Sequence, residues 1–544
     1  MNIRVYFKEI LLVLLYVVLQ SAIFHLPQAW PLGFVSLVPL LFVIYLCPGR
    51  KEALYLGGLA GFLQTAGTFY WILHVTKFGY LAMCVYLSVY TALFAVLAFG
   101  SVQVLGRSGT DGFGWGWIKT LTLASLWVLI EFVRSYIPVM RFPWALLGYS
   151  QWKNLPFIQS ADVWGAFGVS FALAFFAVGV FGAWMLAARF GRGEMKLDKY
   201  AAQLILIAGL PLLLAGLNIG YGLNAIHDIK AAQTQAMPHS RVAVVQGNIP
   251  QEQKWDARIQ EMIFRKYDGL SRQVIMESPD LVVWPETSFP GFWEAEPELT
   301  QRVSSLAREI PSELFIGTPT YRESQFGVDK MNSAIHISKA GKELKRYHKT
   351  HLVPFGEYVP FFKFIRRFFD DIGHFAPGEE LTLFKTPVRW NYGVTPDTHP
   401  RAFSALICFE DIFPDLCRKF VRKGSSMLIN ITNDAWFKNS TGPYQHAQSS
   451  VFRAVENRVP VVRSANTGLS CYIDTTGRVV DTLKDNGREL MVAGFKVFDV
   501  ALNHTTTLYT TFGDWLVVAL LIIFVLSHRL LTNKLDTTPT DDLE

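Results

Sequence analysis

Residues Phe403–Pro414 read FSALICFEDIFP, and this stretch determines how the soluble part of the chain is interpreted. Its first five residues, 403–407, form an apolar run of the kind that makes a buried strand. Cys408 ends the run, and Glu410 and Asp411 follow closely. A cysteine at the carboxyl end of a buried strand stands where a nucleophile would be held. For a cysteine taken alone, a core position is the commoner outcome, because free cysteines are among the most buried side chains.

Short apolar segments alternate with helical ones around this stretch. We expect strands at 241–246, 281–284, 314–317, 334–338, 403–407, 427–431, 461–464, 470–474 and 490–495. We expect helices at 257–276, 299–309, 411–423 and 444–458, and a hairpin or turn at 340–344. Such alternation predicts a layered α/β domain, which we place at residues 224–510.

The rest of the 544-residue chain is strongly apolar. Hydrophobic residues make up 51% of the chain and charged residues only 17%, whereas about a quarter of a soluble protein is charged. Asp, Glu, Lys and Arg are absent from residues 10–49, 53–76, 78–106, 163–188 and 201–227. Uncharged apolar runs of about 20 residues can cross a bilayer as helices. We therefore expect a polytopic α-helical membrane protein that carries a soluble domain.

These runs predict eight membrane spans. Seven lie in a membrane domain of residues 1–223, near 10–25, 32–47, 53–75, 80–105, 117–136, 165–188 and 201–221. The eighth lies within residues 511–531, near 512–528, and a tail of residues 532–544 follows it. A cleaved signal peptide is rejected for the first span, because the second follows at once and no small-residue cleavage site is present.

Lys and Arg residues predict the orientation of the spans. They are concentrated at the N-terminus, in the loops after spans two, four and six, and in the C-terminal tail. The positive-inside rule then places both termini in the cytoplasm and residues 224–510 outside it. In a bacterium with two membranes, the soluble domain would lie in the periplasm and the spans in the inner membrane. The net charge of +6 follows from this loop bias and does not indicate a nucleic-acid partner.

The segment 131–165 is rich in aromatic residues and interrupted by prolines. Trp and Tyr favour the boundary between membrane and water, so we expect this segment to lie in the outer interface. Glu131 and Arg134 are three residues apart and share a helix face, where they can pair. A structural ion pair and a role in holding lipid headgroups are both open for these two residues.

Three polar residues follow apolar segments and together suit acyl transfer. They are Glu286 in WPETSFP, Lys349 in YHKTHLVPFGEYVP and Cys408 in ICFEDIFP. A carboxylate can take the thiol proton and return it to a leaving group. An ammonium lowers the pKa of a nearby thiol and stabilises an oxyanion. The set is therefore sufficient for catalysis through a thioester.

These three motifs, in this order, resemble those of the nitrilase (carbon–nitrogen hydrolase) superfamily. Within it, the chain is most similar to bacterial apolipoprotein N-acyltransferases, through VVQGNIPQEQKW (244–255), NITNDAWFKNSTGPYQH (430–446), RAVENRVPVVRSANTGLS (453–470) and FPWALLGYSQ before span six. The resemblance extends over nearly the whole chain. It implies an α-β-β-α sandwich for the soluble domain, with Glu286 as general base, Lys349 as oxyanion stabiliser and Cys408 as nucleophile.

The resemblance also assigns supporting residues. It implies that Glu357 orients Lys349 or shares the role of base, although a structural salt bridge would explain Glu357 as well. Glu410 falls on a further functional position, and Trp255 and Trp436 are implied to contact substrate. Phe409 departs from the family, which commonly has Tyr after the nucleophile, so any hydrogen bond from that hydroxyl is absent here.

The implied reaction moves an acyl chain from a phospholipid, typically phosphatidylethanolamine, through a cysteine thioester to the N-terminal amine of a diacylglyceryl-cysteine lipoprotein. We expect a monomer with no cofactor, and no metal site, because the sequence lacks HExxH and paired CxxC motifs. Two alternatives are a membrane-anchored amidase, which leaves the spans unexplained, and a scaffold or transporter, which leaves the Glu–Lys–Cys set unexplained.

Two further hypotheses concern the neighbourhood of Lys349. His348 and His351 flank it, so a Cys–His pair is conceivable, although the family pattern supplies a base without histidine. Residues 359–375, VPFFKFIRRFFDDIGHF, alternate aromatic and charged side chains. We interpret this segment either as a mobile loop that admits lipid or as an ordinary surface helix with a buried aromatic face.

Overall fold

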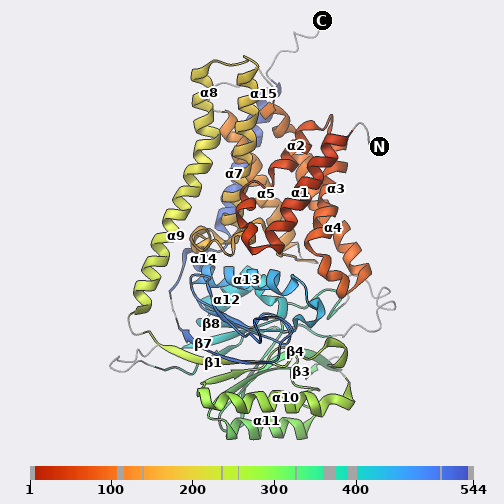
Figure 1. Ribbon diagram of the computed structural model, residues 1–544, viewed down its shortest axis with the longest axis vertical. Helices are drawn as coiled ribbons and strands as arrows, with labels where there is room; N and C mark the ends of the chain where they lie inside the picture. Colours follow the sequence, from red (N-terminus) through yellow and green to blue (C-terminus); the bar gives the residue numbers. More distant parts are fainter. Residues whose placement is uncertain are drawn as a thin grey trace. The chain divides into compact units, whose positions relative to one another are not determined.

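The computed structural model describes residues 6–106, 115–137, 140–234, 237–254, 256–324, 327–358, 375–389, 401–502 and 505–536. The chain divides into two compact units (Figure 1). Residues 1–225 and 512–544 form the helical unit, and residues 226–511 form the α/β unit.

The helical unit is built from long apolar helices. Their bounds are α1 Phe7–His25, α2 Val38–Leu46, α3 Arg50–Thr68, α4 Lys77–Gly106, α5 Trp115–Tyr136, α7 Ala161–Gly191, α8 Leu197–Leu204, α9 Leu210–Thr234 and α15 Trp515–Asp536, with the short α6 Leu155–Ile158 before α7. Small residues let neighbouring helices approach closely. A Cβ at Gly57 of α3 would lie 2.5 Å from Cβ of Ala95 on α4, so glycine is required at this crossing.

Five helical segments are long and apolar enough to cross a membrane, within the residues that the structure describes. They are Phe7–His25, Lys77–Gln103, Gly116–Tyr136, Ala161–Gly191 and Leu197–Ala232. The pair Pro27–Phe34 and Val38–Leu46, bent by 42°, makes a sixth if it is one span. Helices occupy the other two predicted positions as α3 and α15, but they do not meet the same criterion. A membrane protein is therefore supported, whereas the number eight stays a prediction.

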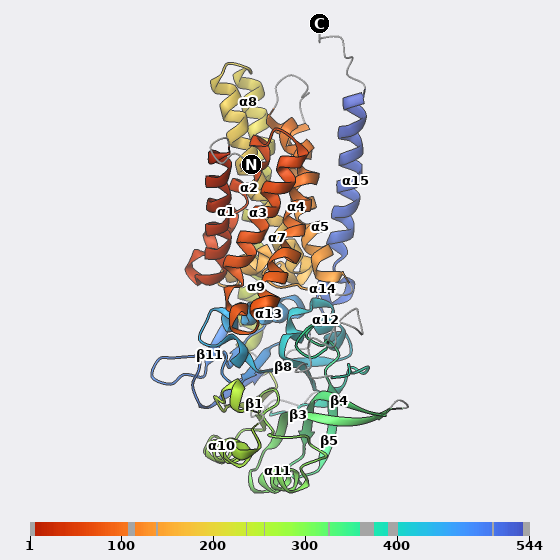
Figure 2. The same ribbon diagram turned by 90° about the vertical axis from the view of Figure 1, so that its right-hand side faces the viewer.

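The α/β unit contains two six-stranded sheets (Figures 1 and 2). The first has the order β12-β1-β2-β3-β4-β5 and the second β11-β10-β9-β8-β7-β6. The strand bounds are β1 His239–Gln246, β2 Leu281–Val283, β3 Glu313–Ser324, β4 Gly327–Ile337, β5 Glu343–His348, β6 Leu383–Lys385, β7 Ala402–Ile407, β8 Ser425–Thr432, β9 Val461–Ala465, β10 Cys471–Ile473, β11 Val479–Thr482 and β12 Gly494–Ala501. β1, β2 and β3 are mutually parallel, as are β7, β8 and β9.

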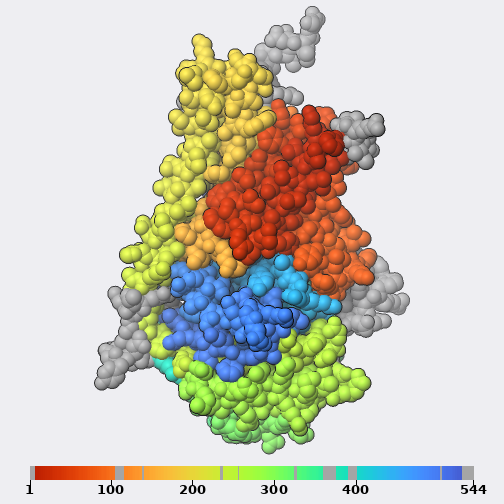
Figure 3. Space-filling view, in the orientation of Figure 1, coloured from red at the N-terminus to blue at the C-terminus, as the bar shows by residue number. Residues whose placement is uncertain are grey.

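Helices cover the outer faces of both sheets. Helices α10 (Gln260–Gln273) and α11 (Pro297–Glu309) lie on the first sheet, and α12 (Pro414–Arg422) and α13 (Gly442–Asn457) lie on the second (Figures 1 and 2). Figure 3 shows the first half of this unit in green and its last third in blue, in contact on the visible face. The layers are those of the expected α-β-β-α sandwich.

Aromatic side chains fill the space between the two sheets. The ring of Phe315 on β3 packs edge-on against Phe384 on β6 and Phe403 on β7, with centroids 5.0 and 5.1 Å apart. All three side chains are fully buried. Such pairs are worth about 0.5–1.5 kcal/mol each beyond the area that they bury, so this cluster fixes how the sheets face one another.

Most predicted strands are present, and one is misplaced. The structure begins β12 at Gly494, whereas the prediction was 490–495. β12 pairs with β1 at an edge of its sheet, and its half-buried Lys496 and exposed Asp499 make its sequence less apolar than that of a central strand. The predicted helix at 411–423 begins only at Pro414, because residues 408–412 form a 3₁₀ turn.

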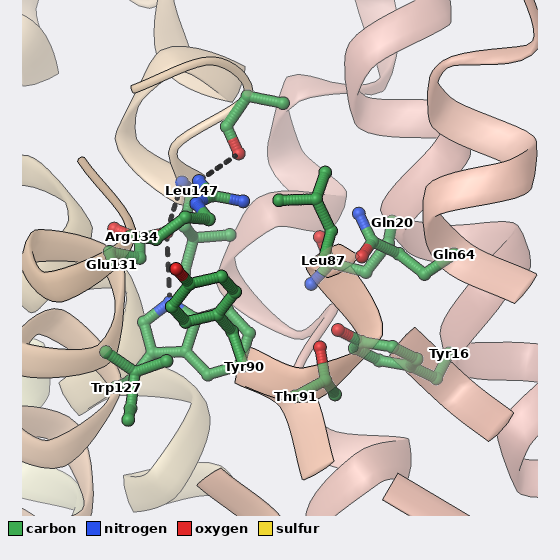
Figure 4. Close-up of a pocket in the computed structure, with 12 residues that line it drawn as sticks. Tyr16, Gln20, Gln64, Leu87, Tyr90, Thr91, Trp127, Glu131, Arg134 and Leu147 are labelled. Atoms are coloured by element: carbon green, nitrogen blue, oxygen red, sulfur yellow. Dashed lines mark hydrogen bonds between the residues drawn. The ribbon is translucent and has the colours of Figure 1, made fainter. Parts of the chain in front are cut away.

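A polar pocket lies among the helices of the helical unit (Figure 4). Its lining side chains include Tyr16, Gln20, Gln64, Tyr90, Thr91, Trp127, Glu131 and Arg134. Oε1 of Glu131 accepts a hydrogen bond from the backbone N–H of Leu147 at 2.7 Å, and Arg134 donates to the carbonyl of Trp144 at 3.1 Å. Glu131 and Arg134 therefore bind the backbone of the segment that follows α5, a structural role that needs no direct ion pair between them.

Candidate active site

Cys408 stands at a strained turn immediately after β7. Its φ of 54° lies in the left-handed region, which non-glycine residues seldom adopt. The side-chain amide of Asn430, on the neighbouring β8, donates to the carbonyl of Cys408 at 2.8 Å and to that of Leu406 at 3.1 Å. Strained backbone of this kind persists where its surroundings hold it, and it clusters at functional sites.

The thiol of Cys408 is protonated at rest. Desolvation of the sulfur raises the pKa of Cys408 well above its ordinary value, and the charge of Glu286 raises it further, while Lys349 acts in the opposite direction. A thiol in this state needs a base at the moment of attack, since the thiolate is the nucleophile.

Glu286 follows β2 and is held by two amides. Its Oε1 accepts from the side chain of Asn332 at 2.8 Å, and its Oε2 accepts from the backbone N–H of Asn433 at 2.9 Å. Nζ of Lys349 lies 3.5 Å from Oε1. Glu286 is only 6% exposed, so its carboxylate is oriented and largely removed from water.

Lys349 forms a closer ion pair with Glu357. Nζ lies 2.9 Å from Oε2 and 3.0 Å from Oε1 of Glu357, and Asn332 donates to both Glu357 and Glu286. Burial lowers the pKa of Lys349, but Glu357 and Glu286 outweigh burial and hold this pKa well above its ordinary value. Lys349 is therefore a permanent cation, as an oxyanion stabiliser must be.

Glu410 connects the segment that carries Lys349 to the turn that carries Cys408. Its Oε1 accepts from the backbone N–H groups of Thr350 and His351, at 2.7 and 3.0 Å, and from the hydroxyls of Tyr347 and Thr350. Its Oε2 accepts from the backbone N–H of Ile407 at 2.8 Å. One fully buried carboxylate thus fixes the segments that carry Lys349 and Cys408 relative to each other.

Phe409 places its ring beside the ammonium of Lys349. Nζ of Lys349 lies 5.6 Å from the ring centroid, within the range of a cation–π interaction. The ring also packs edge-on against Phe413 at 5.1 Å. Phe409 therefore retains the electrostatic and packing contributions of an aromatic residue without a hydroxyl.

A buried charge network lies near Cys408. His446 contacts Asp411 through Nε2 at 2.8 Å and Asp434 through Nδ1 at 3.0 Å, and Arg463 contacts Asp411 at 2.5 Å. The network reaches the site through Thr432, which donates to Asp434 at 2.9 Å and bonds the sulfur of Cys408. Burial lowers the pKa of His446, but the two carboxylates raise it to about 9. His446 is thus an imidazolium that neutralises buried carboxylates.

Comparisons with known proteins bear on both units. Residues 241–501 match the family described as Carbon-nitrogen hydrolase, and residues 17–179 match the Apolipoprotein N-acyltransferase N-terminal domain. The apolipoprotein N-acyltransferase of Geobacter metallireducens is 36% identical over 525 residues, which cover 94% of each chain. The chain belongs to the apolipoprotein N-acyltransferase family.

Other members of the family are more distant. That of Haemophilus influenzae is 29% identical, in an alignment that covers 92% of this chain and 91% of the relative. That of Brucella melitensis is 32% identical, in an alignment that covers 77% of this chain and 73% of the relative. Among solved structures, an amidase from Nesterenkonia sp. is 18% identical with a TM-score of 0.35, covering 49% of this chain and 92% of its own. Family membership confirms the resemblance inferred from the sequence motifs, and apolipoprotein N-acyltransferases are acyltransferase enzymes.

The remaining residues singled out from the sequence have varied positions. Trp255 and the segment 359–374 lie outside the described residues. Trp436 lies in the 3₁₀ turn Asp434–Phe437 and is 46% exposed. His348 bonds the hydroxyl of Ser333, and His351 bonds that of Thr350. Three assignments stay predictions: substrate binding by the two tryptophans, lipid entry through the segment 359–375, and a Cys–His pair that involves one of the two histidines.

Two residues of the candidate site, Asn332 and Lys254, were not expected from the sequence. Asn332 lies in the middle of β4 and gives no local signal, because only strand pairing brings it to Glu286. Lys254 lies within the motif that ends at Trp255, and its cationic side chain among polar residues resembles ordinary surface. The structure buries it beside Glu286 instead.

Proposed function

We propose that this protein is an apolipoprotein N-acyltransferase that moves an acyl chain from a membrane phospholipid to Cys408, and then to the N-terminal amine of a diacylglyceryl-cysteine lipoprotein. One observation carries the proposal: a relative of that name aligns over 94% of both chains, so the similarity includes the helical unit as well as the α/β unit. An enzyme of small soluble amides would have no use for the helices.

In the first half-reaction, the carboxylate of Glu286 takes the thiol proton as the sulfur of Cys408 attacks the ester carbonyl carbon. Lys349 stabilises the oxyanion of the tetrahedral intermediate. When the intermediate collapses, the ester C–O bond breaks, and Glu286 gives its proton to the departing lysophospholipid oxygen. A thioester remains on Cys408.

In the second half-reaction, the lipoprotein amine attacks the thioester carbonyl. The C–S bond breaks, and Glu286 carries a proton from the attacking nitrogen to the sulfur. The products are an amide and the free thiol. Water must be kept from the thioester during the exchange, because hydrolysis would waste the acyl chain.

Both substrates are held in the bilayer by their acyl chains, at about 0.8 kcal/mol per buried CH₂. We therefore place the protein in the inner membrane as a monomer with eight spans, with both termini in the cytoplasm and residues 224–510 in the periplasm. Phosphatidylethanolamine is the proposed donor, and Trp255 and Trp436 are proposed to contact substrate.

The test is intact-mass spectrometry of purified protein incubated with phosphatidylethanolamine vesicles. We expect the wild type to gain the mass of one acyl chain, and Cys408→Ala to gain none. Cys417→Ala, a matched change at a buried free thiol on α12, should still acquire the chain. Adding a diacylated lipopeptide should then remove the adduct and lengthen the peptide by one acyl group.

Other outcomes would separate the alternatives. An unmodified wild-type protein that hydrolyses small amides would support the amidase instead. Equal acylation from phosphatidylglycerol vesicles would contradict the headgroup preference but leave acyl transfer intact.

A further inference from the structure

Lys254 is a second buried lysine at the candidate active site. It follows the 3₁₀ turn Gln251–Gln253, is 5% exposed, and its Nζ donates to the backbone carbonyl of Glu286 at 2.8 Å. Among the residues that the structure describes, no carboxylate lies within the 4.0 Å of a salt bridge to Nζ. Lys349 and Lys254 thus share one site but differ in their partners.

This difference sets the protonation of Lys254. Burial lowers the pKa of Lys254 to about 7, although the charge of Glu286 raises it and Cys408 would raise it only as a thiolate. The neutral form is therefore well populated near neutral pH. Neutral Nζ keeps a hydrogen for the carbonyl of Glu286 and has a lone pair with which to accept a proton.

The second half-reaction releases one proton that is not transferred through Glu286 to the sulfur. An α-amine has a pKa of about 8, so the lipoprotein N-terminus arrives mainly as an ammonium with three protons. The product amide keeps one of them, and Glu286 passes one to the sulfur of Cys408. The third must leave before attack, because an ammonium has no lone pair.

We propose that Lys254 is the second proton acceptor of the site, whose neutral amine takes the first proton from the incoming α-ammonium and later releases it to water. This inference rests on the acyl-transfer function proposed above. The first half-reaction, in which Glu286 takes a proton and gives it back, does not need Lys254. The two lysines thus have different roles: Lys349 is a permanent cation, and Lys254 is a proton acceptor.

The experiment measures each half-reaction separately by rapid quench and intact mass. Lys254→Met keeps the length and apolar stem of the side chain, and Lys254→Arg keeps a fixed charge. We expect both variants to lose much less of the rate of acyl-enzyme formation from phosphatidylethanolamine vesicles than of the rate of transfer. Transfer from this acyl-enzyme to a diacylated lipopeptide near neutral pH should fall by about a hundredfold, the scale of a lost general base.

Two controls separate proton transfer from positioning. Transfer by Lys254→Met should recover as the pH rises above about 8, because the peptide amine then arrives neutral. Hydroxylamine, which is already neutral near pH 7, should remove the acyl chain from variant and wild type at equal rates. If Lys254→Met does not fold, the pH dependence of the wild type is the test. The rate of acyl transfer from the wild-type acyl-enzyme to the lipopeptide should rise with pH through a pKa near 7. The rate of acyl transfer to hydroxylamine should show no such rise.

Equal slowing of both half-reactions at every pH would show that Lys254 only positions the Glu286 peptide, and would overturn the proposal. Unchanged transfer to the lipopeptide in Lys254→Met would do the same while leaving acyl transfer established. A wild-type protein that forms no acyl-enzyme would instead reject the proposed function itself.

Discussion

Replacing Glu410 with alanine should disrupt the site without touching either reacting side chain. The substitution leaves the backbone N–H groups of Thr350, His351 and Ile407 without their acceptor. A buried donor without a partner costs about 1–3 kcal/mol, and because water can reach the half-buried Thr350 and His351, we expect a total loss of about 3–5 kcal/mol. That is a large share of the stability of about 5–15 kcal/mol that is typical of a folded protein.

Glu410→Gln should be milder. With its oxygen toward Thr350 and His351, the amide keeps that group of hydrogen bonds and turns its NH₂ toward the N–H of Ile407. We expect this variant to lose about 1–2 kcal/mol. Because misplacement by about 1 Å can cost a hundredfold in rate, acylation of Cys408 should fall by about a hundredfold in Glu410→Ala and less in Glu410→Gln.

The assay combines the rate of acyl-enzyme formation with the thermal unfolding midpoint in detergent. Glu379→Ala, at a side chain that is 82% exposed, is the matched control and should leave both unchanged. A Glu410→Ala protein that acylates at the wild-type rate would refute the claim that this carboxylate holds the two segments together. Slow acylation at undiminished stability would point to a direct chemical role instead.

Three further changes test other features. Phe409→Leu removes a cation–π interaction worth about 0.5–2 kcal/mol and should slow acylation severalfold, whereas Phe409→Tyr should retain the rate; an equal rate for Leu would show that the ring is dispensable. The pKa of His446 is raised from 6.5 to about 9 on folding, so its stabilisation is complete below pH 6.5 and is lost as the pH rises through 9. The free energy of unfolding should therefore fall by on the order of 3 kcal/mol between these pH values, and the thermal midpoint should fall with it; an equal fall of the midpoint in His446→Gln would contradict this. Glu131→Ala leaves the N–H of Leu147 without its acceptor and should lower the free energy of unfolding by about 1–3 kcal/mol, which is measured as a lower thermal midpoint. An unchanged midpoint would show that the segment after α5 does not depend on this hydrogen bond for its stability.

The sequence patterns succeed where one local rule decides the structure. β8 and β9 are buried along their entire lengths, and the apolar residues at 427–429 and 461–462 were enough to locate them. β12 lies at an edge and follows a different pattern, and the prediction failed there. Glu286 and Lys349 follow β2 and β5 of the first sheet and lie 3.5 Å apart, whereas Cys408 follows β7 of the second sheet.

The parts that were missed depend on non-local contacts. Asn332 reaches Glu286 and Glu357 only because β4 pairs with β3 in a particular register. Lys254 is buried because its loop brings it to the backbone of Glu286. No sequence pattern near Lys254 predicts this burial. In the helical unit, α3 contains several glycines and polar residues, so composition alone did not establish that it spans a membrane.

The binding of residues 144–147 by Glu131 and Arg134 bears on how this protein is assembled during synthesis. Both charges belong to α5, which also carries the buried Lys119 and has the lowest mean hydropathy of the five apolar segments, 1.4. A charged residue at the centre of a helix costs about 2.5–3.5 kcal/mol on insertion and costs less near an end; Glu131 and Arg134 lie in the last two turns of α5, and the backbone groups that they bind leave the ribosome after them. α5 is therefore poorly suited to enter the bilayer alone. The charges of Glu131 and Arg134 therefore gain their backbone partners only once the segment through Leu147 has been made.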